Sequence, residues 1–390
     1  MESNSTLLIY NATIVYSETC EYHKDAALLI KNSKIAKIFF NKSDWIDQVE
    51  NTNIQALDAK GGILGPGFVD MHFHGCGGYD TNSDNKEEAL LHMVKTLKNK
   101  GITTFQPTIH YDLSSIKKLA KAINNNKELQ DHISGLYIEG PFINKIKKGG
   151  LSASSIREPD IKVLNELLDI KINDKCAVQT MTVAPELENV DSIIDILTKN
   201  DILIGFGHSD AKITDVPQLK KYHFTHLFNA MNGINHKNPG LAMFPFLYKN
   251  EVDITCEMIG DGVHIDYNTL KFTFNCLNEN QVCLISDSML FTTLVSKGPM
   301  IYVGKEAYCD GRACYYCDDN TLIGSCNLTI DTARILLEKN IITKELFFKI
   351  GAVNPARALK LINKGSIEVG NIADLILLNS EYKVIKVFKS

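Results

Sequence analysis

From residue 60 onward, short β-rich apolar runs alternate with longer segments of helical period. This alternation is typical of a parallel sheet whose strands are joined by crossover helices. Eight such runs can be counted, and eight is the strand number of a (β/α)8 barrel. They lie near Leu64–Met71, Thr103–Thr108, Ile133–Ile138, Val178–Val183, Ile202–Phe206, Phe224–Phe228, Ile254–Ile259 and Val282–Ile285.

The two ends of the chain differ from the middle. Residues 6–38 and 365–389 consist of short alternating runs without a long helix, which indicates small β-strands. We predict an α/β protein: a (β/α)8 TIM-like barrel with a small β-sandwich domain formed by the N- and C-terminal segments. The expected boundaries are 1–60 plus 363–390 for the β-domain and 61–362 for the barrel.

Composition excludes several classes of protein. Hydrophobic residues make up 44% of the 390 residues and charged residues 22%, as in an ordinary folded domain. The net charge of −5 argues against a nucleic-acid partner, and the apolar runs are too short for a membrane span. The ten cysteines include no second C-x-x-C beside Cys314 and Cys317, which suits a reducing compartment. We therefore expect a cytoplasmic protein without nucleic-acid or membrane partners.

Two histidines one residue apart, His72 and His74, end the first apolar run in the sequence PGFVDMHFHG. Alternate side chains of a strand share a face, so both imidazoles are expected to point the same way. Imidazole is the commonest protein ligand of zinc and binds iron as well. Because such a pair is more often a surface or packing feature, its value as a metal signal depends on the rest of the chain.

Six of the eight predicted strands are followed by a histidine or an acid. Catalytic groups of such barrels project from the carboxyl ends of the strands, so these side chains should converge. Any one of them alone would be explained as a helix cap or a core residue. Together they offer several nitrogen and oxygen ligands for a metal and one spare carboxylate, which predicts a metal-dependent hydrolase. They are His72, His74, Glu139, His208, His226, His264 and Asp287.

The motifs around these residues resemble the amidohydrolase superfamily over nearly the whole chain. They are PGFVDMHFHG, YIEGPF, GFGHSDA, THLFNAM, PGLA, DGVH, SDS and GSIEVGNIADLILLN. EGPF, THLFNAM and DGVH in this order are specific to the branch that deacetylates N-acetylglucosamine 6-phosphate. In that branch a glutamate, here Glu139, stands where many relatives carry a modified lysine. The resemblance implies hydrolysis to glucosamine 6-phosphate and acetate by a homodimer in amino-sugar breakdown.

The resemblance also implies a metal site. Glu139, His208 and His226 would hold the main divalent ion, and His72 and His74 would allow a second one beside it. Zinc is the first expectation, with iron and manganese as alternatives that His and Glu ligands also suit. The number of ions, one or two per subunit, stays open at this point.

Catalytic and substrate-binding roles follow from the same motifs. Asp287 would act as general base on the attacking water and then pass the proton to the departing amine. Asn229, the backbone at Ala230, and His264 would bind the sugar phosphate, assisted by Lys237 from a neighbouring subunit.

The chain departs from the family pattern in three places. Leu151 replaces a histidine that in the family helps to polarise the acetyl carbonyl. Lys237 replaces an arginine, which keeps the charge but loses the planar fork that grips phosphate. Residues 324–328 are one residue longer than the usual Gly-Ser-x-Leu. These departures leave open a different N-acyl amine or amino-sugar phosphate as substrate. A non-catalytic barrel scaffold is a further alternative, against which the retention of every candidate ligand and Asp287 argues.

Overall fold

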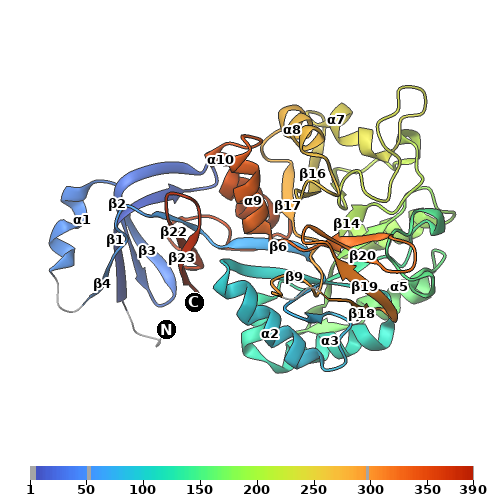
Figure 1. Cartoon of the computed structure of the whole chain (residues 1–390), viewed down its shortest axis with the longest axis horizontal. Helices are drawn as coiled ribbons and strands as arrows, with labels where there is room; N and C mark the ends of the chain where they lie inside the picture. The colour runs from blue at the N-terminus through green and yellow to red at the C-terminus, as the bar shows by residue number, and fades with distance from the viewer. Residues whose placement is uncertain (1–5, 51–53, 296–297, 390) are drawn as a thin grey trace.

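A computed structural model describes residues 6–50, 54–295 and 298–389. Eight parallel strands form one sheet whose order follows the chain. The sheet is nearly closed: its first and last strands meet where the backbone amide of Asp287, just after the last strand, donates to the carbonyl of His72 at 3.0 Å. The predicted barrel is thereby confirmed (Figure 1). Its strands are β6 (Phe68–Phe73), β9 (Ile102–His110), β10 (Leu136–Glu139), β13 (Val178–Val183), β14 (Leu203–Phe206), β15 (Lys221–Phe224), β16 (Asp253–Ile259) and β17 (Val282–Ile285).

Two of the predicted strand ranges are wrong. The run Leu64–Met71 contains two strands, because β5 (Ile63–Pro66) belongs to another sheet and β6 begins only at Phe68. The chain crosses between the sheets at Gly67, where a Cβ atom would lie 2.3 Å from the side chain of Thr103. The range Phe224–Phe228 is also wrong: β15 ends at Phe224, and the residues that follow form a turn with positive φ at two positions.

Helices connect the strands on the outside of the barrel. The first, α2, begins after Asn85, whose side chain accepts a hydrogen bond from the backbone of Glu88, and it buries Leu90, Val94 and Leu97. The chain then turns at Gly101, whose φ of 88° favours glycine. The helices of the barrel are α2 (Lys86–Asn99), α3 (Leu113–Asn125), α4 (Lys127–His132), α5 (Ile161–Leu168), α6 (Val190–Lys199), α7 (Phe244–Tyr248), α8 (Tyr267–Cys276), α9 (Thr329–Glu338), α10 (Lys344–Phe348) and α11 (Asn354–Ala358).

The N-terminal and C-terminal segments pair in one mixed sheet of seven strands beside the barrel (Figure 1). Its order is β23-β22-β5-β1-β2-β3, with β4 added on β1. Apolar side chains are buried on both of its faces, Trp45 of helix α1 (Lys42–Val49) among them. Since β5 is part of it, the sheet extends past residue 60. The strands are β1 (Thr6–Tyr16), β2 (Glu21–Lys31), β3 (Lys34–Phe39), β4 (Gln55–Asp58), β5 (Ile63–Pro66), β22 (Leu375–Leu378) and β23 (Val384–Phe388).

A four-stranded antiparallel sheet after β17 was not predicted. Its strands are only three to five residues long and contain no long apolar run. A backbone bridge between Ser288 and Ser325 ties it to the end of β17. The strands are β18 (Met300–Tyr302), β19 (Lys305–Cys309), β20 (Ala313–Tyr316) and β21 (Leu322–Ser325). Among the described residues, no helix is both long and apolar enough to cross a bilayer.

Candidate metal centre

Glu139, the last residue of β10, lies at the centre of the barrel mouth. Its Oε1 atom is 3.0 Å from the Nε2 atoms of both His208 and His226. The two Nε2 atoms are themselves 3.1 Å apart, and all three side chains are buried. Three ligand atoms converge here from the ends of β10, β14 and β15, of which β10 is separated from β14 by β13 in the sheet.

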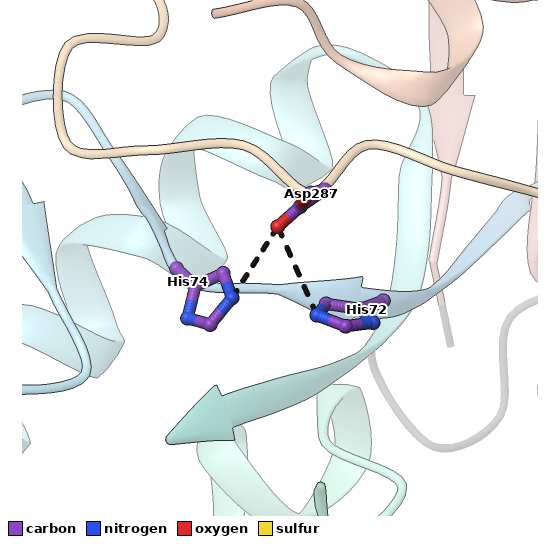
Figure 2. Close-up of side chains that lie close together, drawn as sticks. All are labelled: His72, His74 and Asp287. Atoms are coloured by element: carbon purple, nitrogen blue, oxygen red, sulfur yellow. Dashed lines mark ion pairs between the residues drawn. The ribbon is translucent and has the colours of Figure 1, made fainter. Parts of the chain in front are cut away.

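A second group of ligand atoms involves Asp287, which follows β17. Its Oδ1 atom is 3.3 Å from Nε2 of His74 and 3.8 Å from Nε2 of His72. Figure 2 shows both imidazoles directed from the end of β6 toward this one carboxylate oxygen. The expectation that the two histidines share a face is met, and Asp287 stands beside both of them.

His110 was not predicted as a site residue, although it ends β9 between the strands that carry His74 and Glu139. Its Nε2 atom lies 3.5 Å from Oε2 of Glu139. With His74 and Glu139 it forms a third group of convergent ligand atoms. The sequence could have indicated this residue. If the second predicted strand is extended by two residues beyond Thr108, it ends at His110, which then shares a face with Thr108.

Outer hydrogen bonds orient two of the imidazoles. Nδ1 of His72 is 2.9 Å from Oε2 of Glu257, and Nδ1 of His208 is 2.8 Å from the carbonyl oxygen of Lys147. In both rings Nε2 is then left to face the site, which is the arrangement that metal-binding histidines usually show. Glu257 also accepts a hydrogen bond from the backbone of His226 at 3.0 Å, so one carboxylate supports two candidate ligands.

The backbone at the mouth adopts an uncommon conformation at three site residues. His226, His208 and Asp287 have φ values of 25°, 46° and 46°, in a region that residues with a side chain seldom occupy. Such conformations cost free energy and concentrate at functional sites. The strand ends are therefore shaped to aim these side chains inward.

The charges of the site suit a cation. Burial alone would raise the pKa of Glu139, but hydrogen bonds from the surrounding histidines hold it well below its usual range. Asp287 is likewise buried, and His74 nevertheless lowers its pKa. The two carboxylates outweigh burial at His74 and raise its pKa to about 10. The negative charge that attracts a proton to His74 would equally attract a divalent ion, and Nε2 of buried His72 has no hydrogen-bond partner. The residues present therefore fit a metal ion.

A cavity of about 190 Å³ opens on this cluster. Asn229, Ala230 and His264 line it, and His264 is held by Asp261 through a 2.7 Å contact at Nδ1. Lys237 is exposed on a loop and does not line the cavity of its own chain. The remaining wall is largely apolar and comprises Leu151, Tyr302, Leu322 and Ile323, beside Gly149 and Gly150.

A nearly closed parallel barrel with histidines and carboxylates gathered at the carboxyl ends of its strands defines a hydrolase of the metal-dependent barrel class. The model of the Amidohydrolase family matches residues 63–390, and the chain belongs to this family.

Several relatives and solved structures are similar over nearly their full length. The N-acetylglucosamine-6-phosphate deacetylase of Lysinibacillus sphaericus is 27% identical over 99% of this chain and 97% of that protein. The protein of the same name from Caenorhabditis elegans is 29% identical over 94% and 90%. The crystal structure of the Pasteurella multocida deacetylase superposes with a TM-score of 0.86 at 24% identity, covering 98% of both chains. A mutant of the Mycobacterium smegmatis enzyme in complex with N-acetyl-D-glucosamine-6-phosphate has a TM-score of 0.84 at 23% identity, covering 99% and 98%.

Proposed function

We propose that this protein hydrolyses the N-acetyl group of N-acetylglucosamine 6-phosphate, giving glucosamine 6-phosphate and acetate. The observation that carries the proposal is the position of Asp287, which lies within 4 Å of two candidate metal ligands and lines the same cavity as Asn229, Ala230 and His264. The names of the relatives, which match nearly the whole chain, support the same substrate.

Glu139, His208 and His226 would hold the first divalent ion, and His72 and His74 are available to a second. An ion held there would lower the pKa of a coordinated water and polarise the acetyl carbonyl. Zinc is our first proposal for its identity, and iron and manganese suit the same nitrogen and oxygen ligands.

Asp287 would carry the proton through the reaction. Its lowered pKa keeps it ionised near neutral pH, so it is ready to accept a proton from the attacking water. The oxygen of that water bonds to the acetyl carbon and produces a tetrahedral oxyanion. Asp287 then returns the proton to the sugar nitrogen as the carbon–nitrogen bond breaks, because without that proton the nitrogen would have to leave as an amide anion, a very poor leaving group. Acetate and the free amine are released, and Asp287 is again ionised.

Substrate recognition would involve two subunits. Asn229, the backbone of Ala230, and the ring of His264 border the cavity and would contact the phosphorylated sugar. The cavity of one chain, about 190 Å³, is smaller than the roughly 300 Å³ at which ligand pockets usually begin. Lys237 of a second copy in a homodimer would complete the phosphate site, which fits its exposed position.

A different N-acyl amine is the second candidate, and Leu151 favours it. This residue is buried in an apolar cluster with Ile143 and Ile156 and borders the cavity where the family pattern has a histidine. An apolar wall at that point would accept a substrate with a larger or less polar acyl group.

Acetate release by the purified protein decides between these readings. We expect turnover of N-acetylglucosamine 6-phosphate that a chelator abolishes, with little turnover of the unphosphorylated sugar or of N-acetylgalactosamine 6-phosphate. Absence of acetate with all three, in protein shown to contain metal, would overturn the proposed substrate and direct the search to other acylated amines.

A further inference from the structure

His110 is a buried histidine of the mouth to which the family motifs assign no role. It is the last residue of β9, and in the barrel sheet it stands directly opposite Glu139 of β10. The other neighbour of β9 is β6, which leads into His74. The fold thus places His110 between two residues already considered as metal ligands.

The two oxygens of Glu139 face different histidines. Oε1 lies 3.0 Å from Nε2 of both His208 and His226. Oε2 lies 3.4 Å from Nε2 of His74 and 3.5 Å from Nε2 of His110. Nε2 of His72 is also 3.6 Å from Oε1, so His208, His226 and His72 lie on the side of one oxygen, and His74 and His110 on the side of the other.

Other contacts of His110 leave it available for a ligand. Its Nδ1 atom is buried without a hydrogen-bond partner, so the ring lacks the outer hydrogen bond of His72 and His208, and Nε2 is the nitrogen that faces Glu139. The ring packs edge-on against that of His74, with centroids 5.4 Å apart. It also borders the cavity, which gives an ion a route to it.

We propose that His110, with His74 and Oε2 of Glu139, is a ligand of the second divalent ion, for which His72 is also available. Oε1 of the same carboxylate serves the first ion with His208 and His226. The proposal rests on the metal dependence of the proposed function and does not depend on which acylated amine is the substrate.

The test counts metal ions in four proteins: the wild type, His110→Asn, His110→Asp and His264→Asn. Each is saturated with Mn²⁺, desalted, and analysed by elemental mass spectrometry and by electron paramagnetic resonance. We expect two ions and a spin-coupled spectrum in the wild type, and one ion with an uncoupled spectrum in His110→Asn. His110→Asp supplies a carboxylate ligand and should recover the second ion. His264→Asn alters the same cavity without removing a proposed ligand and should keep both.

Two results would overturn the proposal. One is a wild type that binds a single ion at saturation. The other is His110→Asn with two ions that resist a chelator as well as those of the wild type, whatever its turnover. A different result would contradict the proposed deacetylase function: a wild-type protein that holds both ions but releases no acetate. Circular dichroism of each variant distinguishes loss of an ion from loss of the fold.

Discussion

Two clusters of buried charge in this molecule are built differently. Between the barrel and the terminal sheet, the carboxylate of Asp374 lies 2.6 Å from the ammonium of Lys389 and 3.3 Å from that of Lys364. Both lysines also donate to the carbonyl of Asp131. At the barrel mouth, Glu139 is surrounded by imidazoles, several of which keep a buried nitrogen without a hydrogen-bond partner.

The difference indicates what each cluster is for. Burying a polar group without a partner costs free energy, so a cluster that serves only stability should satisfy its members with protein atoms, as the first one does. At the mouth, Nε2 of His72 faces the site without a hydrogen-bond partner, so this cluster offers a ligand atom to an external partner. We therefore expect changes at the mouth to reduce metal binding or rate, and changes around the terminal sheet to reduce stability.

The largest effect is expected at the mouth, for Asp287→Asn. Asparagine has nearly the same size but neither accepts nor returns a proton, so turnover should fall by several powers of ten. Metal content and melting temperature should stay near those of the wild type. The control is Asp266→Asn, an exposed helix cap where asparagine caps equally well. A near-normal rate in Asp287→Asn would refute its role as proton carrier.

In the terminal sheet, Leu375→Ala should reduce stability without reducing metal content. Leu375 is fully buried in β22, and emptying such a site costs about 2–5 kcal/mol of unfolding free energy. Urea unfolding measures this loss, and Leu247→Ala, at a half-exposed leucine, is the matched control. Loss of metal from the folded Leu375→Ala protein would show that packing in the terminal sheet also affects metal binding at the barrel mouth.

A smaller effect is expected for Glu257→Gln, because Glu257 does not line the cavity. Glutamine keeps the hydrogen bond to the backbone of His226 but removes the negative charge that orients His72. Such outer partners typically contribute 10- to 100-fold in metal affinity or activity. Chelator competition measures the affinity, with the exposed Glu251→Gln as control. Unchanged metal affinity and unchanged rate would mean that Glu257 contributes to stability and not to metal binding.

Many of the site residues at the barrel mouth were predictable from the sequence, because one rule gives their positions. Histidines and acids that follow apolar runs converge wherever the runs are parallel strands of one barrel, and this rule located Glu139, His208 and Asp287 without knowledge of any distance. His110 was missed only because the second strand was ended two residues too early.

Other features had no local signal. Glu257 lies inside a buried strand, and its contact with His72 joins residues 185 positions apart. The sheet of β18–β21 is built from strands too short to show a period. The crossing at Gly67 depends on the close approach of Thr103, which only the packed structure reveals. In each case the determining contact is distant in sequence, so no window of residues contains it.

The smallest effect concerns Lys389, which pairs with Asp374 between the barrel and the terminal sheet, and it depends on pH. Burial lowers the pKa of this lysine to about 8, and Asp374 offsets only part of that cost. Between pH 8 and the ordinary lysine value of 10.5, the unfolded chain binds more protons than the folded one, so stability should rise with pH. Relative to Lys389→Met, which has no such proton, the wild type should gain roughly 2 kcal/mol between pH 7 and pH 9.5. Urea unfolding of both proteins at the two pH values measures the gain. If the difference in unfolding free energy between the two proteins stays constant or falls as the pH rises, the ion pair with Asp374 outweighs the burial of Lys389. Charge would then stabilise this cluster more than burial destabilises it.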